Sequence, residues 1–309
     1  MRGKSIKVAV IILTLNQREK TLRCLESFQA LKSPAFKIVL WDNGSRDGTA
    51  GAIRETFPEV MVVEHPRNLG VASGRNEAAK VAIREFNPPY LLFLDNDMTV
   101  TPDFLDALLA PFENRTSLAQ TTGKICELSN ASRLYGAGGY RIRFWRGDTK
   151  HIGYREIDQG QYDKPRKCYP SGGCMLVRTE VYQKLHGFDA TFDPYGSEDL
   201  DFGLRAKKAG YYGLYVPRAK VFHEPVPGFV FNREETSRLL TAQWSKHWLL
   251  LMERHAPLWQ KLLFPFLSAP YLFVRAAIRS CQNRNPEILK GLWAGFWEFG
   301  KSRLQRKAV

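Results

Sequence analysis

Two carboxylates separated by one residue follow a short apolar run near position 95. The run covers residues 90–94 and has the length and composition of a buried strand, and Asp95-Asn96-Asp97 comes directly after it. Carboxylates are costly to bury alone, but a divalent cation and a phosphate group neutralise them at the open end of a sheet. Mg²⁺ and Mn²⁺ are usually held by one or two carboxylates together with substrate phosphates. The triplet therefore indicates metal-assisted binding of a phosphorylated substrate, whereas an Asp-x-Asp taken alone is better explained by a solvated turn.

A second acidic pair, Glu198-Asp199, falls in the first turn of a helix predicted at residues 197–208, with Ser197 as its N-cap. Neighbouring residues on a helical turn point about 100° apart. One carboxylate can therefore face a substrate while the other positions it, and a carboxylate can take the proton of an alcohol in a transition state. The alternative explanation is compensation of the helix macrodipole.

The first hundred residues alternate between strand-like and helix-like segments. Apolar runs predict strands at residues 8–13, 37–41, 60–64 and 90–94, and helical spacing predicts helices at residues 19–30, 48–57 and 72–86. This alternation predicts right-handed βαβ units and a parallel sheet, so the expected fold class is α/β. Ligands of such sheets bind beyond the carboxyl ends of the strands.

Polar residues gather at those strand ends. In chain order they are Thr14, Asn16, Asp42, Asn43, Asn68, Gly70 and the triplet after residue 94. Asn, Asp and Gly are ordinary turn residues, so each one alone would be unremarkable. Because all four ends carry them, the sequence predicts one shared binding site.

The chain is less regular after residue 123. Residues 123–173 are rich in Gly, Tyr and Arg, which predicts short strands and loops. Gly172-Gly173 opens a further strand and indicates a close approach of the backbone to another group. A helix is expected at residues 180–185, and a last strand is expected to end at His223. The aromatic residues Trp145, Tyr169 and Tyr195 are candidates either for stacking on a sugar or for core packing.

The last quarter of the chain is basic and rich in tryptophan. The formal net charge is +14, and twelve Lys or Arg stand against three Glu after residue 235. An amphipathic helix is expected with Leu239, Leu240, Trp244, Trp248 and Leu251 on one face. Asn285 is expected to cap another helix that starts with Pro286. A kinked, basic segment of this kind suits a membrane interface, and the alternative is a helical cap packed on the catalytic core.

The remaining composition narrows the class of protein. The five cysteines are scattered without C-x-x-C spacing, so neither a zinc site nor a disulfide framework is indicated, and a cytosolic compartment fits best. The basic N-terminus followed by residues 8–13 is expected to be a strand rather than a signal peptide. No run of about 18 uncharged apolar residues predicts a membrane-spanning helix.

Four motifs together resemble family 2 glycosyltransferases with the GT-A fold, in the rhamnosyltransferase-type branch. They are residues 39–49 around Asp42, Asn68-Leu69-Gly70 with Gly74-Arg75-Asn76, the Asp95-Asn96-Asp97 triplet, and Ser197-Glu198-Asp199-Leu200-Asp201. The resemblance covers roughly residues 6–235. It implies an α/β GT-A fold, a Rossmann-like fold of nucleotide-diphospho-sugar transferases, and an inverting transfer from such a donor.

The resemblance also implies how the donor is bound. Asp42 would accept a hydrogen bond from a pyrimidine base, and Thr14 and Asn16 would line that pocket. Arg75 would face the diphosphate, and Asp95 would contact the ribose or the phosphate side. The other donor-binding candidates are Asn43, which stands where family members carry a second Asp, together with Asn68, Gly70 and Asn96.

By the same resemblance, Asp97 would bind Mg²⁺ or Mn²⁺ directly. His223 would complete the metal site, since neutral imidazole suits Mn²⁺, although a lone His is as often structural. The cation would stabilise charge on the leaving nucleoside diphosphate. Asp199 would act as the base toward the acceptor hydroxyl, and Glu198 would orient the acceptor.

We therefore expect a glycosyltransferase domain at residues 1–235 and an amphipathic helical extension at residues 236–309, which is expected to lie at a membrane interface. The donor would carry a sugar such as rhamnose, and the acceptor would be a glycan or lipid-linked glycan at the cytoplasmic face of the membrane. One alternative is a sugar-nucleotide-forming nucleotidyltransferase, but residues 14–18 lack the glycine-rich basic loop such enzymes need. Another is a nucleic-acid-binding protein, but no nucleic-acid motif accompanies the charge, and we expect no nucleic-acid partner.

Overall fold

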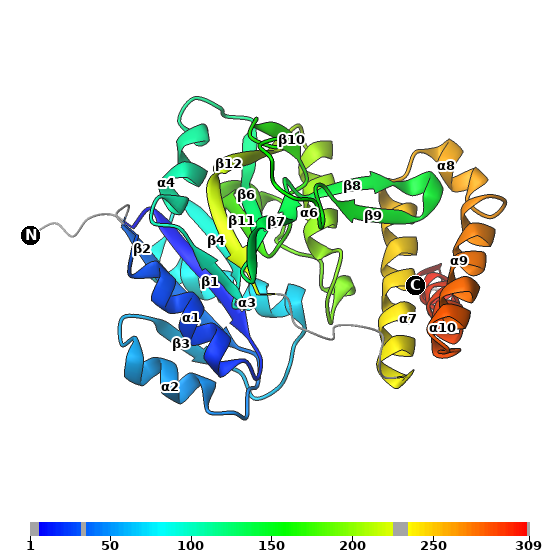
Figure 1. Cartoon of the computed structure of the whole chain (residues 1–309), viewed down its shortest axis with the longest axis horizontal. Helices are drawn as coiled ribbons and strands as arrows, with labels where there is room; N and C mark the ends of the chain where they lie inside the picture. Colours follow the sequence, from blue (N-terminus) through cyan, green and yellow to red (C-terminus); the bar gives the residue numbers. More distant parts are fainter. Residues whose placement is uncertain (1–5, 32–34, 225–233, 308–309) are drawn as a thin grey trace, which may run out of the picture. The chain divides into compact units, whose positions relative to one another are not determined.

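The computed structural model describes residues 6–31, 35–224 and 234–307, and the chain divides into two compact units (Figure 1). The sheet unit comprises residues 1–141 and 150–225. The helical unit combines residues 142–149 with residues 226–309. Residues 142–149, which the sequence assigns to the first domain, thus belong with the C-terminal helices.

The first half of the large sheet is parallel, as predicted. β1 (Val8–Thr14) lies between β2 (Phe36–Asp42) and β4 (Tyr90–Asp95), and β3 (Met61–Glu64) follows β2. The connecting helices are α1 (Arg18–Phe28), α2 (Thr49–Thr56) and α3 (Val71–Phe86). Leu13 pairs with Trp41 on one side and Asp95 on the other, so the polar ends of β1, β2 and β4 meet at one edge of the sheet.

The second half of the sheet is mixed. β11 (Cys174–Arg178) runs antiparallel to β4 and to β6 (Leu118–Glu127), while β12 (Tyr212–His223) runs parallel to β6. Three further strands join its margins: β5 (Met98–Val100), β7 (Asn130–Ala137) and β10 (Arg166–Cys168). The strand expected after Gly172-Gly173 and the one expected to end at His223 are thus confirmed.

The alternation along β1 explains why its sequence is apolar throughout. Val8, Val10 and Ile12 pack in one cluster with Leu25 and Phe28 of α1. Ala9 and Ile11 point to the other face, where the small residues of α3 allow that helix to lie close: Ala72, Ala78, Ala79 and Ala82. A strand covered on both faces has no polar face, as expected for a parallel sheet between helices.

Three helices and a hairpin complete the sheet unit. The helices are α4 (Phe104–Leu109), α5 (Thr179–Lys184) and α6 (Glu198–Lys208). Ser197 occupies the N-cap position of α6 as predicted, but its φ is 78° and its side chain makes no capping hydrogen bond. β8 (Tyr140–Arg143) and β9 (Asp148–His151) form a separate two-stranded sheet whose tip belongs to the helical unit.

The helical unit contains α7 (Glu234–His255), α8 (Leu258–Leu263), α9 (Ser268–Gln282) and α10 (Glu287–Lys307). Asn285 caps α10 as predicted, since its Oδ1 accepts a hydrogen bond from the backbone N–H of Glu287 at 3.1 Å. α7 and α10 approach closely at two glycines, because a Cβ at Gly291 would lie 2.5 Å from the carbonyl oxygen of Arg238, and one at Gly295 would collide with Ala242.

The predicted apolar face of α7 is only partly right. Leu240, Trp248 and Leu251 are buried, whereas Leu239 and Trp244 are exposed. A helix that contacts neighbours on more than one of its sides does not bury one simple apolar face. The spacing of its apolar residues therefore predicts only some of the buried ones. Within the described ranges, no helix combines the length and the apolarity that crossing a bilayer requires.

Candidate active site

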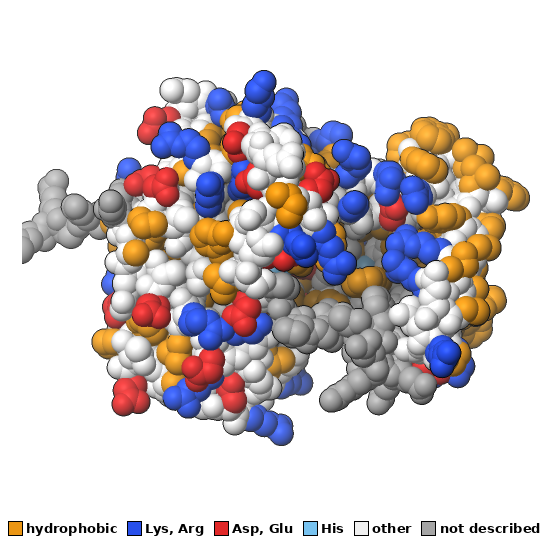
Figure 2. Space-filling model, in the orientation of Figure 1, with side chains coloured by type: hydrophobic (Ala, Val, Ile, Leu, Met, Phe, Trp, Pro, Cys, Tyr) orange, Lys and Arg blue, Asp and Glu red, His pale blue; other side chains and the backbone are white. Residues whose placement is uncertain are grey.

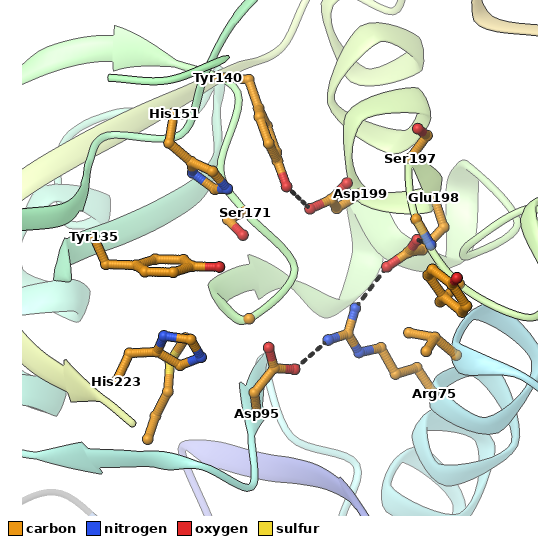
Figure 3. A pocket seen from close by; sticks show the side chains of 15 residues that line it. Arg75, Asp95, Tyr135, Tyr140, His151, Ser171, Ser197, Glu198, Asp199 and His223 are labelled. Atoms are coloured by element: carbon orange, nitrogen blue, oxygen red, sulfur yellow. Dashed lines mark hydrogen bonds and ion pairs between the residues drawn. The ribbon is translucent and has the colours of Figure 1, made fainter. Parts of the chain in front are cut away.

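A cavity of about 240 Å³ opens at the carboxyl end of β4 (Figure 3). Every residue that lines it belongs to the sheet unit. The charged and aromatic ones are Arg75, Asp95, Tyr135, Tyr140, His151, Tyr195, Glu198, Asp199 and His223. They come from α3, β4, β7, the β8–β9 hairpin, α6 with the segment before it, and β12, so the cavity joins segments far apart in the sequence.

Arg75 links two carboxylates at the base of the cavity. Its Nη2 donates to Oδ1 of Asp95 at 2.7 Å, and its Nη1 donates to Oε1 of Glu198 at 2.9 Å. Burial alone would lower the pKa of Arg75, but the nearby carboxylates, Asp95 first among them, raise it above its ordinary value. A permanently charged, planar guanidinium held in this way suits recognition of a diphosphate.

Glu198 is buried beside two other charged groups. Its Oε2 accepts a hydrogen bond from the backbone N–H of Gly196 at 2.9 Å. Burial first, and then the negative charge of Asp199, raise the pKa of Glu198 to about 7, against the opposing effect of Arg75. The side chain that the sequence assigns to orienting the acceptor is therefore locked to Arg75.

Three donors fix the orientation of Asp199. Its Oδ2 accepts hydrogen bonds from the backbone N–H of Gly172 at 2.7 Å and from the Tyr140 hydroxyl at 3.1 Å. Its Oδ1 accepts from the backbone N–H of Leu200 at 2.6 Å. The carboxylate lines the cavity, so a proton acceptor stands where an acceptor hydroxyl could reach it.

The glycine pair before β11 makes this arrangement possible, as predicted. A Cβ at Gly172 would collide with Nη1 of Arg75 and would lie 3.1 Å from Cβ of Asp199. A Cβ at Gly173 would lie 2.5 Å from Oδ2 of Asp95. The backbone therefore comes close to the charged cluster only because both residues lack a side chain.

Asp97 and His223 meet beside the cavity. β12 pairs His223 with Met98, the residue after Asp97, and this register places Nε2 of His223 3.3 Å from Oδ2 of Asp97. Oδ1 of Asp97 and Nδ1 of His223 are buried and have no hydrogen-bond partner among the described residues. A carboxylate oxygen left over beside an imidazole is a donor set that fits Mn²⁺ or Mg²⁺. Across the described part of the chain, no group of three or more His, Cys, Asp or Glu forms a complete metal site.

The residues expected around the base lie at the ends of β1 and β2 and do not line the cavity. Oδ1 of Asp42 accepts hydrogen bonds from the backbone N–H groups of Gly44 and Ser45 at 3.1 and 2.7 Å. Asn16 Oδ1 accepts from the backbone N–H of Arg46 at 2.8 Å, which ties the two strand ends together.

Thr14 and Asn96 form a buried polar contact under the same edge. Nδ2 of Asn96 donates to the hydroxyl oxygens of Thr14 at 3.1 Å and of Thr21 at 2.9 Å. This contact joins β1, α1 and the segment after β4, so both side chains already serve the fold.

Asn43, Asn68 and Gly70 build the loop that leads into α3. Nδ2 of Asn43 donates to Oδ1 of Asn68 at 2.7 Å and to the carbonyl oxygen of Gly70 at 3.2 Å. Gly70 has a φ of 92°, which favours glycine. Like Thr14 and Asn96, these residues lie outside the cavity and position what lines it.

The cavity residues Tyr135, Tyr140, His151 and Ser171 belong to none of the sequence motifs. The aromatic rings form one wall, with 4.2 Å between the ring centres of Tyr135 and His223 and 4.4 Å between those of Tyr140 and His151. Burial lowers the pKa of His151 to about 4. The only sequence signal near them is Gly138-Gly139, where the chain turns with φ of 94° and 73°. Of the aromatic candidates from the sequence, Tyr195 lines the cavity, whereas Trp145 and Tyr169 do not.

Comparison with known proteins places this arrangement in a family. The profile described as glycosyl transferase family 2 matches residues 9–186, more than half of the chain. The chain belongs to glycosyl transferase family 2. A second profile, described as N-terminal domain of galactosyltransferase, matches residues 153–224 of this glycosyltransferase. The predicted enzyme class is thus confirmed, and the nucleotidyltransferase alternative is set aside.

Curated relatives of the glycosyltransferase include a bacterial rhamnosyltransferase and a bacterial O-antigen biosynthesis protein. It is 26% identical to an N-acetylglucosaminyl-diphospho-decaprenol L-rhamnosyltransferase of Mycobacterium tuberculosis, over 91% of this chain and 97% of the relative. It is 28% identical to the O-antigen biosynthesis protein RfbC of Myxococcus xanthus, over 69% of this chain but 17% of that protein. The predicted resemblance to the rhamnosyltransferase-type branch is confirmed.

Solved structures confirm the GT-A fold of the glycosyltransferase. It matches GalNAc-T7, solved with UDP, GalNAc and Mn²⁺, with a TM-score of 0.63 and 18% identity over 80% of this chain and 48% of that one. It matches the mannosyltransferase PcManGT of Pyrobaculum calidifontis, solved with GDP-Man and Mn²⁺, with a TM-score of 0.56 and 18% identity over 96% and 88%.

Proposed function

We propose that this glycosyltransferase moves a sugar, with inversion and with the help of a divalent cation, from a nucleoside diphosphate to a hydroxyl of a lipid-linked glycan. The observation that carries the proposal is the cluster in which Arg75 bridges Asp95 and Glu198 while Asp199 lines the same cavity. The cluster offers a cation for a diphosphate and a carboxylate for a hydroxyl proton within one site.

Asp97 and His223 are the residues we propose to hold the cation. The unpartnered Oδ1 of Asp97 supports this, as do the two similar structures that contain Mn²⁺. A bound Mg²⁺ or Mn²⁺ stabilises the negative charge that develops on a leaving diphosphate. Arg75 would bind the same diphosphate from the other side of Asp95, and we keep Asp42, Thr14 and Asn16 as the proposed base pocket.

Asp199 is our proposed base. In the proposed step the acceptor hydroxyl gives its proton to Asp199, its oxygen bonds the anomeric carbon, and the bond from that carbon to the diphosphate oxygen breaks. Nucleoside diphosphate leaves with the electron pair. Glu198 would act through Arg75, since its Oε1 accepts a hydrogen bond from that residue.

The Mycobacterium tuberculosis relative suggests the substrates. Its name gives L-rhamnose as the sugar and N-acetylglucosaminyl-diphospho-decaprenol as the acceptor, and the two chains align over 91% of this one. We therefore propose a rhamnose-type donor and a polyprenyl-diphosphate sugar acceptor, used by a peripheral enzyme at the cytoplasmic face of the membrane.

The test is a donor screen on the purified full-length protein. Uridine, thymidine and guanosine diphosphate sugars, including dTDP-L-rhamnose, are incubated with a polyprenyl-diphosphate-N-acetylglucosamine acceptor and Mn²⁺, Mg²⁺ or EDTA. We expect nucleoside diphosphate release and a glycolipid product of inverted anomeric configuration with one donor class. Full turnover in EDTA, or a product of retained configuration, would contradict the proposal.

Two variants separate the assigned roles. Asp97→Ala should lose turnover without unfolding, because Oδ1 of Asp97 has no hydrogen-bond partner and Oδ2 gives up a single 3.3 Å contact with His223. Asp106→Ala on the exposed side of α4 should be unchanged. Asp199→Asn should lose about 10²–10⁴-fold in turnover. It should still bind the donor in calorimetry, and loss of donor binding instead would reassign Asp199.

A further inference from the structure

Exposed large hydrophobic side chains are concentrated in the helical unit. Sixteen are exposed across the described residues, and all but Leu128 and Ile157 belong to this unit. Seven that are more than half exposed lie on α8, α9 and the turn between them, and we call them the apolar face: Leu258, Trp259, Leu262, Phe266, Leu267, Val274 and Ile278. Figure 2 shows hydrophobic side chains gathered over α8 and α9. Patches of this kind mark interaction sites.

The fold does not need the apolar face. α9 already packs its other side on α10, where the ring centres of Phe273 and Trp293 are 5.3 Å apart and Ala276 is buried with Ile288 and Leu292. Val274 and Ile278 are one helical turn apart and lie outside that contact, at 59% and 51% exposure. Hydrophobic residues on both sides of one helix indicate that something outside the unit covers the second side.

The charge of the same segment identifies the kind of surface. Residues 258–284 carry four basic residues, Lys261, Arg275, Arg279 and Arg284, and no acidic residue. Among the described side chains of α7 and α10, Glu253 lies 3.0 Å from Arg303 and Glu298 lies 3.8 Å from Lys246. An apolar face with tryptophan and a purely basic border matches an anionic bilayer, which offers hydrocarbon below a layer of phosphates.

We propose that the apolar face inserts into the surface of an anionic lipid bilayer, with Arg275 and Arg279 at the level of the headgroup phosphates. The two arginines follow Val274 and Ile278 directly in the sequence, so an inserted α9 carries them to the boundary between hydrocarbon and water. This inference rests on the peripheral membrane location in the proposed function and deepens it by naming the face and the kind of lipid. The binding needs neither sugar donor nor acceptor, so a vesicle experiment can fail while sugar transfer is still observed.

The first experiment uses the full-length protein and two kinds of vesicle. We expect co-sedimentation with phosphatidylcholine vesicles that contain 30% phosphatidylglycerol, and weaker binding to phosphatidylcholine alone or in high salt. Cys281 is exposed at the end of α9, whereas Cys24, Cys126 and Cys174 are buried. An environment-sensitive fluorophore on Cys281 should therefore shift to the blue on the anionic vesicles.

Two sets of variants assign the binding to this face. The triple variant Leu258→Ser, Leu262→Ser and Phe266→Ser should lower the partition coefficient at least about 30-fold. The matched control, Leu128→Ser with Ile157→Ser in the sheet unit, should leave it unchanged. The double variant Arg275→Gln with Arg279→Gln should have a partition coefficient roughly 25-fold lower on anionic vesicles and unchanged on neutral ones.

Several outcomes would overturn the proposal. One is a wild-type protein that does not bind anionic vesicles. Another is a triple variant that binds them as strongly as the wild type does. A third is a dimer in vesicle-free buffer that the triple variant abolishes, because a second copy would then cover the face. If circular dichroism shows that the triple variant does not fold, the arginine double variant and the Cys281 fluorophore test the proposal. Unchanged binding of the arginine variant together with an unshifted fluorophore would then contradict it.

Discussion

Arg75 sets the charge balance of the cavity, because its guanidinium contacts carboxylates from two different elements. We expect Arg75→Gln to destabilise the protein by about 3 kcal/mol, the lower end for a broken buried pair, since Glu198 can take up a proton once the cation is gone. Urea denaturation measures the change. Arg75→Lys keeps the positive charge but loses the planar guanidinium that donates to two carboxylates at once. It should therefore restore stability to a greater extent than it restores donor binding.

Adding Glu198→Gln to Arg75→Gln provides the check. The two residues share one contact, at 2.9 Å, so the double variant should lose clearly less stability than the sum of the single losses. Additive losses would show that the pair does not act as a unit.

His151 makes the stability of the sheet unit depend on pH. Burial lowers its pKa from 6.5 to about 4 in the folded protein. The unfolded chain therefore binds more protons between these values, and stability falls as the pH drops through that window. We expect wild type to lose about 2 kcal/mol more than His151→Gln between pH 7 and pH 5. Urea melts in metal-free buffer measure this, and equal losses would contradict it.

At the scale of elements, β8 carries a residue that positions the proposed base. The Tyr140 hydroxyl donates to Asp199, and burial together with that carboxylate raises the pKa of Tyr140 well above its ordinary value, so the donor stays protonated. Tyr140→Phe should lower turnover about 10–100-fold, the equivalent of one hydrogen bond to a charged group. The donor dissociation constant should not change. A variant with wild-type turnover would show that the backbone N–H groups of Gly172 and Leu200 are enough to hold Asp199.

The contact between α7 and α10 depends on a missing side chain. Gly295→Ala should destabilise the helical unit by about 1–3 kcal/mol, because the new methyl group meets Ala242 and Ser245. Gly300 lies on the same helix with nothing within 4 Å of its Cβ position, so Gly300→Ala should stabilise slightly through helix propensity. Thermal melts followed by circular dichroism distinguish the two, and identical effects would argue against the close contact.

At the scale of the molecule, the two units should respond separately to ligand. All cavity residues belong to the sheet unit. A nucleoside diphosphate with Mn²⁺ at 100 times its dissociation constant should therefore stabilise that unit by about 2.7 kcal/mol. Calorimetry should show a higher melting temperature for the transition of the sheet unit and an unchanged one for the helical unit. A common shift of both transitions would mean that the units unfold as one.

The parallel half of the sheet was predictable because the sequence of each strand there is apolar enough to show that the strand is buried. β1 to β4 are short apolar runs, and the residues that follow them gather at one edge, as the spacing of βαβ units requires. The close approach at Gly172 was also predictable, because a glycine pair at the start of a strand indicates it. The acidic pair at 198–199 pointed to a site only through the family resemblance, because acidic residues are common in the first turn of a helix.

The aromatic wall was not predictable. Tyr135, Tyr140 and His151 lie on two local hairpins, β6–β7 and β8–β9, and nothing in their sequence shows that these hairpins line the same cavity as Arg75 and Asp199. The sequence placed the C-terminal helices at a membrane interface as a prediction, but it did not identify which apolar residues of α8 and α9 face outward. Periodicity reveals that a helix has an apolar side but not which side the fold uses.

Gly172 and Gly173 have a consequence for the comparison of related protein sequences. A methyl group at either position would displace Arg75 or Asp95. A homologue that encodes alanine there must have moved its own counterparts of these residues. The dipeptide can thus sort distant relatives into those that share this arrangement of charges and those that need a separate structural description.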